Sequence, residues 1–316
     1  MQINRRSHYL CLKRFSLPLT CAFVFLSLRQ AEAQDIILKD SFIKKYKNRV
    51  TISVNFIVDH AKDSPNTIGT GGDDGDLHIA GRSLEVGLPM VAEIVNARTE
   101  QDAVKLVDTL VATGEKVPLV GIWRLWCEHP GKNDHVQGKP VGIPKHTNPD
   151  HVFEIHPVTD IKSRDLSGSV GVIPGYIAYS AEVAFGKYEG KAFTIIHDPS
   201  KKRTTLRTKM IGWNYTRFKI EISGEDQKVV EDGRFVIADV LDASGETIAS
   251  RIRMVFLKDS DAEDEVKNLG AGDRLEVLGV PRIDLEEVWS RVKKGKSNPD
   301  VLKRDLPYEM IILGVY

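Results

Sequence analysis

The side chains that could carry chemistry lie in three strand-like segments of the first half of the chain: DLHIA supplies Asp76 and His78, MVAEIV supplies Glu93, and VFEIHP supplies Glu154 and His156. Side chains two positions apart on a strand share a face, so each segment carries a polar face opposite an apolar one. Histidines and carboxylates bind Zn²⁺ and related divalent transition metals, and a bound metal can activate water for hydrolysis. Without a metal, a carboxylate–histidine pair can act as a general base.

A purely structural interpretation explains the same five residues. Opposite charges and polar groups that face each other across strands stabilise an exposed sheet face. Arg124, in a neighbouring segment, could join Glu154 in such a ladder, and the sequence contains no established metal motif such as H-E-x-x-H. Both interpretations stay open, and the metal interpretation takes Asp76, His78, Glu154 and His156 as its ligands, with zinc as the example.

The segments around these residues predict a small β-barrel. Apolar and polar residues alternate with period two in most of them, as in half-buried strands, whereas residues 99–114 show helical spacing and end in glycine. Three strands, a helix and two further strands follow one another, which is the element order of an OB-fold. In that topology the second, third and fifth strands are neighbours, so we expect the five polar residues to form one outward-facing patch. The predicted strands are 49–60, 76–82, 88–96, 117–129 and 151–161.

The second half of the chain predicts another barrel of the same kind. A hairpin over 233–259 precedes a short helix over 261–270, and further strand and helix patterns continue to the final strand at 306–316. Residues 176–223 alternate as strands and hairpins. The expected fold is therefore mainly β with short helices, built as tandem small OB-like β-barrels. The predicted parts are a signal peptide (1–33), an OB-like barrel (34–165), a connecting β-hairpin region (166–225) and a second OB-like barrel (226–316).

The N-terminal segment is typical of a secretory signal peptide. Basic residues precede the apolar run 15–28, and Ala31-Glu32-Ala33 forms an A-x-A cleavage site before Gln34. Removal of residues 1–33 takes five basic residues and one acidic residue from 44 of each, which leaves 39 basic and 43 acidic. Cys127 is then the one remaining cysteine, so no disulfide can form within the mature chain. These features predict a periplasmic or secreted protein without a membrane span after cleavage.

A basic strip over residues 201–219 offers a second candidate site. Positive charges with interleaved aromatic rings suit a single-stranded nucleic acid or an anionic polysaccharide. The competing interpretation is a pair of polar strands whose aromatic rings pack inward, and the mildly acidic mature chain argues against nucleic acid as the main partner. The candidate polyanion-binding residues are Lys201, Lys202, Arg203, Arg207, Lys209, Trp213 and Tyr215.

Taken together, the motifs D-G-D-L-H, M-V-A-E-I, V-G-I-W-R-L-W-C-E-H and F-E-I-H-P-V-T resemble a group of exported bacterial proteins of unknown function. That group has an OB-like barrel with a D-x-H strand and a closing E-I-H-P-V strand. The resemblance covers residues 49–161 and implies that the five polar residues are signature positions. It brings no established activity.

The sequence thus predicts an exported OB-like binding protein whose ligand, a small molecule or a polyanion, is recognised on the outer face of the first barrel. The alternative is a metal-dependent hydrolase of the phosphodiesterase or nuclease type. In that alternative the catalytic cluster consists of Asp76, His78, Glu154 and His156.

Overall fold

The computed structural model describes residues 33–212, 214–295 and 302–316. The predicted signal peptide, apart from its last residue, lies outside the described residues, as does Trp213. Among the helices that are described, none has the length and apolar character needed to cross a membrane.

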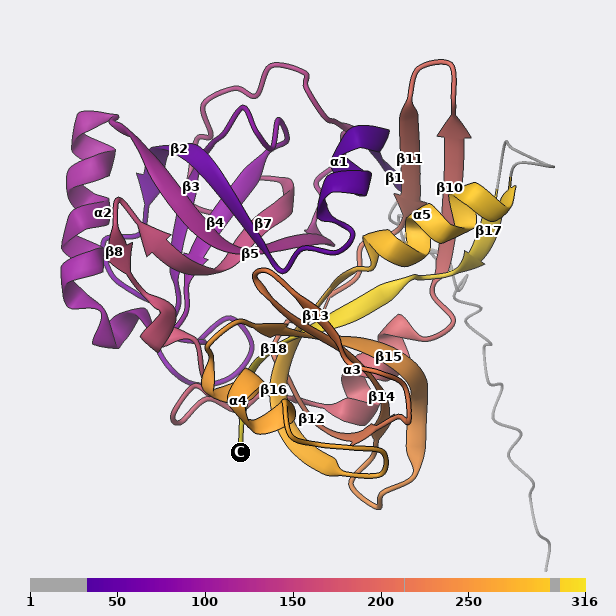
Figure 1. Ribbon diagram of the computed structural model, residues 1–316. Coiled ribbons are helices and arrows are strands. Elements are labelled where there is room, and N and C mark those ends of the chain that lie inside the picture. Colours follow the sequence, from indigo (N-terminus) through magenta and orange to yellow (C-terminus); the bar gives the residue numbers. More distant parts are fainter. Residues whose placement is uncertain (1–32, 213, 296–301) are drawn as a thin grey trace, which may run out of the picture. The chain divides into compact units, whose positions relative to one another are not determined.

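Five strands of the first half close into a barrel (Figure 1). Each strand pairs with two neighbours in the order β2-β3-β4-β7-β5 and back to β2, and β4 and β7 run parallel. This is the OB-fold order, with α2 between the third and fourth strands as predicted. The elements are β2 (Thr51–Ala61), β3 (Leu77–Arg82), β4 (Met90–Ile94), α2 (Gln101–Thr113), β5 (Lys116–His129) and β7 (His151–Ile161), with the short strand β8 (Arg164–Asp165) and the 3₁₀ turn η1 (Ala97–Thr99) attached.

Alternating side chains and one glycine explain how this barrel closes. In β2, Ile52, Val54 and Phe56 are buried in the barrel, whereas the residues between them face outward. At Gly121 of β5, a Cβ atom would lie only 2.4 Å from the backbone oxygen of Pro157 on β7. The close approach of these two strands therefore requires glycine at this position.

The second half forms a barrel with the same topology (Figure 1). Its ring order is β12-β14-β15-β18-β16 and back to β12, with β15 and β18 parallel and α4 between the third and fourth strands. Tandem OB-like barrels are thereby confirmed, and the first strand of the second barrel begins ten residues before position 226. The elements are β12 (Thr216–Ile222), β14 (Gly233–Leu241), β15 (Thr247–Leu257), α4 (Asp261–Val266), β16 (Arg274–Ile283) and β18 (Tyr308–Val315), flanked by β13 (Lys228–Val230) and β9 (Tyr179–Ser180).

A third, open sheet collects segments from distant parts of the chain. Its strand order is β17-β10-β11-β1-β6, and helices α1 and α5 contact each other beside it (Figure 1). The short strand β6 lies in the proline-rich loop of the first barrel, residues 130–150 between β5 and β7. It pairs with β1, which fixes that loop to this sheet. The elements are β1 (Gln34–Lys39), α1 (Asp40–Tyr46), β6 (His135–Val136), β10 (Ala192–Asp198), β11 (Arg203–Thr208), α5 (Leu285–Lys294) and β17 (Leu302–Asp305).

One segment of the region predicted to contain strands and hairpins is a helix. The prediction for 176–223 is wrong over α3 (Ala181–Tyr188), which follows the 3₁₀ turn η2 (Ser167–Ser169) and strand β9 in the chain. Ala181, Ala184, Phe185 and Tyr188 are its buried residues, and their spacing of three and four places them on one helix face. The helical period was present in the sequence, but the short segment also allowed alternation.

Candidate functional site

The predicted polar residues of the first barrel do lie on neighbouring strands. His78 of β3 faces Glu93 of β4 directly, and Arg124 of β5 faces Glu154 of β7. His156 follows two positions after Glu154 and shares its face. Asp76 stands immediately before β3.

The prediction of an exposed patch is wrong. Asp76 and His156 are 0% exposed, and Glu154 and Glu93 are 2% and 4% exposed. Their side chains point away from the barrel interior but are covered by later parts of the chain. Tyr215 reaches His156 from one side, and Arg124 donates to the backbone oxygen of Pro281 in the second barrel at 2.9 Å.

His156 stands at the centre of this buried polar cluster. Its Nε2 lies 2.7 Å from the hydroxyl of Tyr215, which in turn donates to Oδ2 of Asp76. Its Nδ1 lies 3.3 Å from Glu154 Oε2 and 2.9 Å from Glu93 Oε2, although the second contact is poorly directed for a hydrogen bond. Burial by itself lowers the pKa of His156, but the surrounding carboxylates outweigh it and raise that pKa well above its usual value. The carboxylates of Glu93 and Glu154 thus favour the protonated, imidazolium form of His156.

Glu154 is fully committed to protein partners. It accepts from Arg124 and lies 3.2 Å from Nε2 of His151. Arg124 also donates to Glu128 at 3.0 Å. Burial opposes ionisation of Glu154, yet Arg124 and the two histidines hold its pKa well below the usual range. This carboxylate is paired in the way a buried charge requires, which is the ladder with Arg124 that the sequence suggested.

The residues that could hold a metal ion differ from the predicted set. Asp76, Glu93 and His156 each offer a ligand atom, and these atoms lie within 4.8 Å of one another. Oδ1 of Asp76 accepts no hydrogen bond from any residue that the structure describes. The predicted ligand Glu154 is engaged by Arg124, and the Nε2 of His78 is 3.7 Å from Glu93. The donor set fits a divalent cation only if the ion displaces Tyr215 or a carboxylate from His156.

A polar cavity of about 380 Å³ opens beside the cluster. The glycine-rich loop between β2 and β3 forms one wall, strands β3, β4 and β7 form the base, and the end of β5 with the proline-rich loop forms the other wall. Tyr179 and Asn214 of the following segment complete it. The lining residues are Lys62, Asn66, Gly71, Gly72, Asp74, His78, Glu93, Glu128, His129, Asn148, Glu154, Tyr179 and Asn214.

Four lining side chains carry buried polar atoms that find no hydrogen-bond partner in the described part of the protein. They are Nδ1 of His78, Oε2 of Glu93, Oδ1 of Asn148 and Oδ1 of Asn214. An unsatisfied buried polar atom costs about 1–3 kcal/mol, so native proteins normally satisfy such atoms with protein, water or ligand. The polar atoms of the lining are thus available to hydrogen-bond a polar ligand. Asp74, whose pKa is raised mainly by burial, is held by Asn66 at 2.9 Å.

The basic strip does not form one exposed surface. Arg207 makes two hydrogen bonds to Asp35, at 2.6 and 2.7 Å, and Arg203 donates to the backbone oxygen of Gln137 at 2.7 Å. Tyr215 is 0% exposed, so the prediction that it stacks on a surface ligand is wrong. Lys201, Lys202 and Lys209 remain exposed at and beyond the ends of β11.

Several site residues escaped the sequence analysis. The hydroxyl of Tyr215 donates a hydrogen bond to Asp76, which lies 139 positions away in the sequence. No local sequence pattern predicts this contact. Asn148 and Asn214 lie in irregular segments, where asparagine is common, so their presence there did not indicate a site. The glycine-rich loop 66–75 has neither a phosphate-loop nor an EF-hand motif, yet Asn66, Asp74 and two of its glycines line the cavity.

Comparison with known proteins does not show a family for this chain. No family model matches the chain, and no curated protein matches it. A solved structure entitled "Structural mimicry for functional antagonism" aligns with 83% of this chain and 94% of its own at 10% identity and a TM-score of 0.17. A similarity this weak carries no argument about fold or function.

Proposed function

We propose that this protein is a binding protein that takes a small hydrophilic ligand in the polar cavity of the first barrel. The observation that carries the proposal is the set of unsatisfied polar atoms in the cavity wall, which belong to His78, Glu93, Asn148 and Asn214. Its position adds support, because OB-folds bind their ligands on the second and third strands between the loops that follow the first and fourth strands. Those strands and loops are the ones that line this cavity.

The lining favours a ligand that brings hydrogen-bond donors. Of the four unsatisfied atoms, two are amide oxygens and one is a carboxylate oxygen of Glu93, and the cavity also contains the carboxyl group of Asp74. Tyr179 is the one large ring in the wall, so an apolar ligand would leave the polar wall unpaired. Hydroxyl-rich or amine-bearing molecules, such as saccharides and amino sugars, fit these groups.

We also propose that the protein acts after export, in the periplasm or outside the cell. The support is the signal-like segment 1–33 with its A-x-A site before Gln34. N-terminal sequencing of the protein recovered from the exported fraction tests this directly. A mature chain that begins at Gln34 is expected, and an uncleaved chain in the cytoplasm would contradict it.

Binding can be tested by calorimetric titration of the purified protein with monosaccharides, amino sugars and short oligosaccharides. Asn148→Leu removes an unsatisfied oxygen from the cavity wall and is expected to weaken the best ligand at least about tenfold, roughly 1.4 kcal/mol. Asn55→Leu is the matched control, since Asn55 is an exposed residue of β2 outside the cavity lining. Equal affinity in both variants, or no binding by any member of the panel, would refute the proposal.

A metal-dependent hydrolase of the phosphodiesterase or nuclease type is the second candidate. The observation in its favour is the grouping of Asp76, Glu93 and His156. If it is correct, the protein purified without chelator contains near-stoichiometric metal by mass spectrometry, and Glu93→Gln loses it. A metal-free protein that cleaves no phosphodiester when zinc or manganese is added would exclude this candidate.

A further inference from the structure

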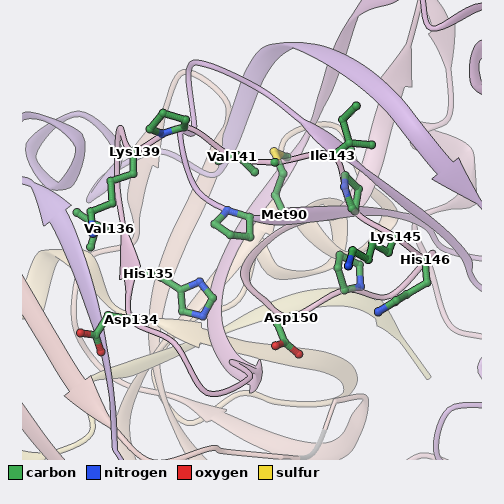
Figure 2. A pocket seen from close by; sticks show the side chains of 16 residues that line it. Met90, Asp134, His135, Val136, Lys139, Val141, Ile143, Lys145, His146 and Asp150 are labelled. Carbon is green, nitrogen blue, oxygen red and sulfur yellow. The ribbon is translucent and has the colours of Figure 1, made fainter.

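A second cavity, of about 420 Å³, lies under the proline-rich loop of the first barrel (Figure 2). Its lining comes from that loop, from β6 and from the start of β4, and shares no residue with the polar cavity. The two cavities are therefore separate candidate sites. The lining residues are Gly81, Pro89, Met90, Asp134, His135, Val136, Lys139, Pro140, Val141, Gly142, Ile143, Pro144, Lys145, His146, Pro149 and Asp150.

This cavity is largely apolar, unlike the first. Met90 lies in the middle of the view in Figure 2, with Val136, Val141 and Ile143 around it. Ile143 is 65% exposed, so a large apolar side chain meets water at the rim. A ligand with an apolar body would remove this surface from water at about 25 cal/mol per Å².

The loop that forms the cavity is held in position before any ligand arrives. Gln137 donates to the backbone oxygen of Val86 at 2.9 Å, and the N–H of Gly138 donates to the oxygen of Gly87 at 2.8 Å. Arg203 donates to the backbone oxygen of Gln137. Four prolines in the lining further restrict the backbone. A preformed site loses less conformational entropy on binding.

Opposite charges stand at different places on the rim. Figure 2 shows Asp134 and Asp150 along the lower edge of the pocket, and Lys139 and Lys145 above them. In the described part of the protein, neither lysine makes an ion pair. Both ammonium groups are therefore free to meet an anionic group of a ligand.

His135 adds a hydrogen-bond acceptor beside Asp134 and Asp150. It is 5% exposed, and its Nε2 lies 2.7 Å from the backbone oxygen of Pro130. Because a carbonyl oxygen can only accept, Nε2 carries the proton of this bond. Burial lowers the pKa of His135 and so favours the neutral ring, in which Nδ1 is an acceptor. Asp134, Asp150 and His135 together suit an ammonium group.

We propose that this second cavity binds short apolar peptides with free termini. The ammonium group would lie at Asp134 and Asp150, the apolar side chains over Met90 and Ile143, and the carboxylate at Lys139 or Lys145. The volume lies within the range of roughly 300–1,000 Å³ typical of small-ligand sites, which admits a di- or tripeptide. This proposal goes beyond the proposed function and does not depend on it.

The test is calorimetric titration of the purified protein with Leu-Leu-Leu and with the same peptide acetylated and amidated. We expect the free peptide to bind and the capped peptide to bind at least about tenfold more weakly, because capping removes both charges. Binding of both forms with equal affinity, or of neither at millimolar concentration, would overturn the proposal.

Paired variants locate the binding. Ile143→Asp places a charge in the apolar rim and is expected to reduce affinity for the free peptide about tenfold or more. Val229→Asp is the matched control, because Val229 is 64% exposed on β13 of the second barrel. Both substitutions are at exposed positions, and circular dichroism confirms that each variant is folded. Equal effects of the two variants on affinity would overturn the assignment to this cavity.

Discussion

At the scale of single residues, the feature that matters most is a buried chain of polar contacts. His156 contacts Tyr215, Glu93 and Glu154, and Tyr215 continues to Asp76. The sequence predicted which strands carry these residues, since period-two alternation placed them on one face. It could not predict their burial, because the residues that cover them come from segments remote in the chain.

Tyr215→Phe should destabilise the protein by about 1–3 kcal/mol, because it removes the hydroxyl that hydrogen-bonds His156 and Asp76, two fully buried groups whose own separation is 3.6 Å. Urea unfolding measures the loss. Tyr316→Phe is the control: Tyr316 is 48% exposed and stacks under Arg217, a contact that phenylalanine retains. The control should stay within about 0.5 kcal/mol of the wild type. A Tyr215→Phe variant as stable as the control would show that the chain of contacts adds little.

The stability of the protein should fall in acid partly through Glu93. Burial opposes its ionisation, but His156 and His78 lower its pKa to about 2 from an unfolded value of 4.5. A depressed folded-state pKa contributes stability above pH 4.5 that is lost as the pH falls toward 2. The stability difference between wild type and Glu93→Gln should therefore be largest above pH 4.5 and shrink below it. Urea midpoints across this range check it, and a constant difference would contradict the assignment; exposed Glu231→Gln is the control.

At the scale of elements, strands were predictable and one short helix was not. In long segments such as 151–161, apolar and polar residues alternate. Only a strand places the apolar residues of such a segment on one face, so the pattern predicts a strand. In α3, eight residues contain an internal glycine and a β-branched valine, which weaken the helical signal. Packing of Phe185 against Phe218 of β12, with ring centroids 5.2 Å apart, selects the helix.

Gly186→Ala tests this helix. Gly186 is exposed within α3, and a Cβ atom there would meet no other atom within 4 Å. Alanine in a helix interior is favoured over glycine by roughly 0.5–1 kcal/mol, so the variant should be more stable by about that amount. Thermal or urea unfolding measures the gain. A loss of stability would contradict the helical conformation of this segment.

At the scale of the whole molecule, buried arginines tie the two barrels together. Arg282 of the second barrel is 0% exposed and donates to the backbone oxygens of Val50 and Trp123 in the first, at 3.2 and 3.0 Å. It also binds Glu309 at 2.7 Å. The sequence predicted two barrels of one topology. Their shared, buried face could not be predicted, because it depends on how distant surfaces pair and not on local periodicity.

Arg282→Ala should therefore destabilise the whole protein strongly. Removing one partner of a buried ion pair costs about 3–5 kcal/mol, and we expect the lower end of this range because Arg253 remains 3.3 Å from Glu309. Arg274→Ala is the control, since Arg274 pairs with Glu221 at the surface and should contribute less than about 1 kcal/mol. Urea unfolding followed by tryptophan fluorescence compares the two. A loss no larger than that of the control would contradict a structural role for Arg282.

The central claim, that the polar cavity receives a small hydrophilic ligand, is tested most directly by a crystal structure of the protein grown with the best ligand from the saccharide and amino-sugar panel. Ligand density is expected between the two loops, within hydrogen-bond distance of Asn148, Asn214 and His78. Density for that ligand elsewhere on the protein would contradict it. A metal ion held by Asp76, Glu93 and His156 would also contradict it and favour the hydrolase.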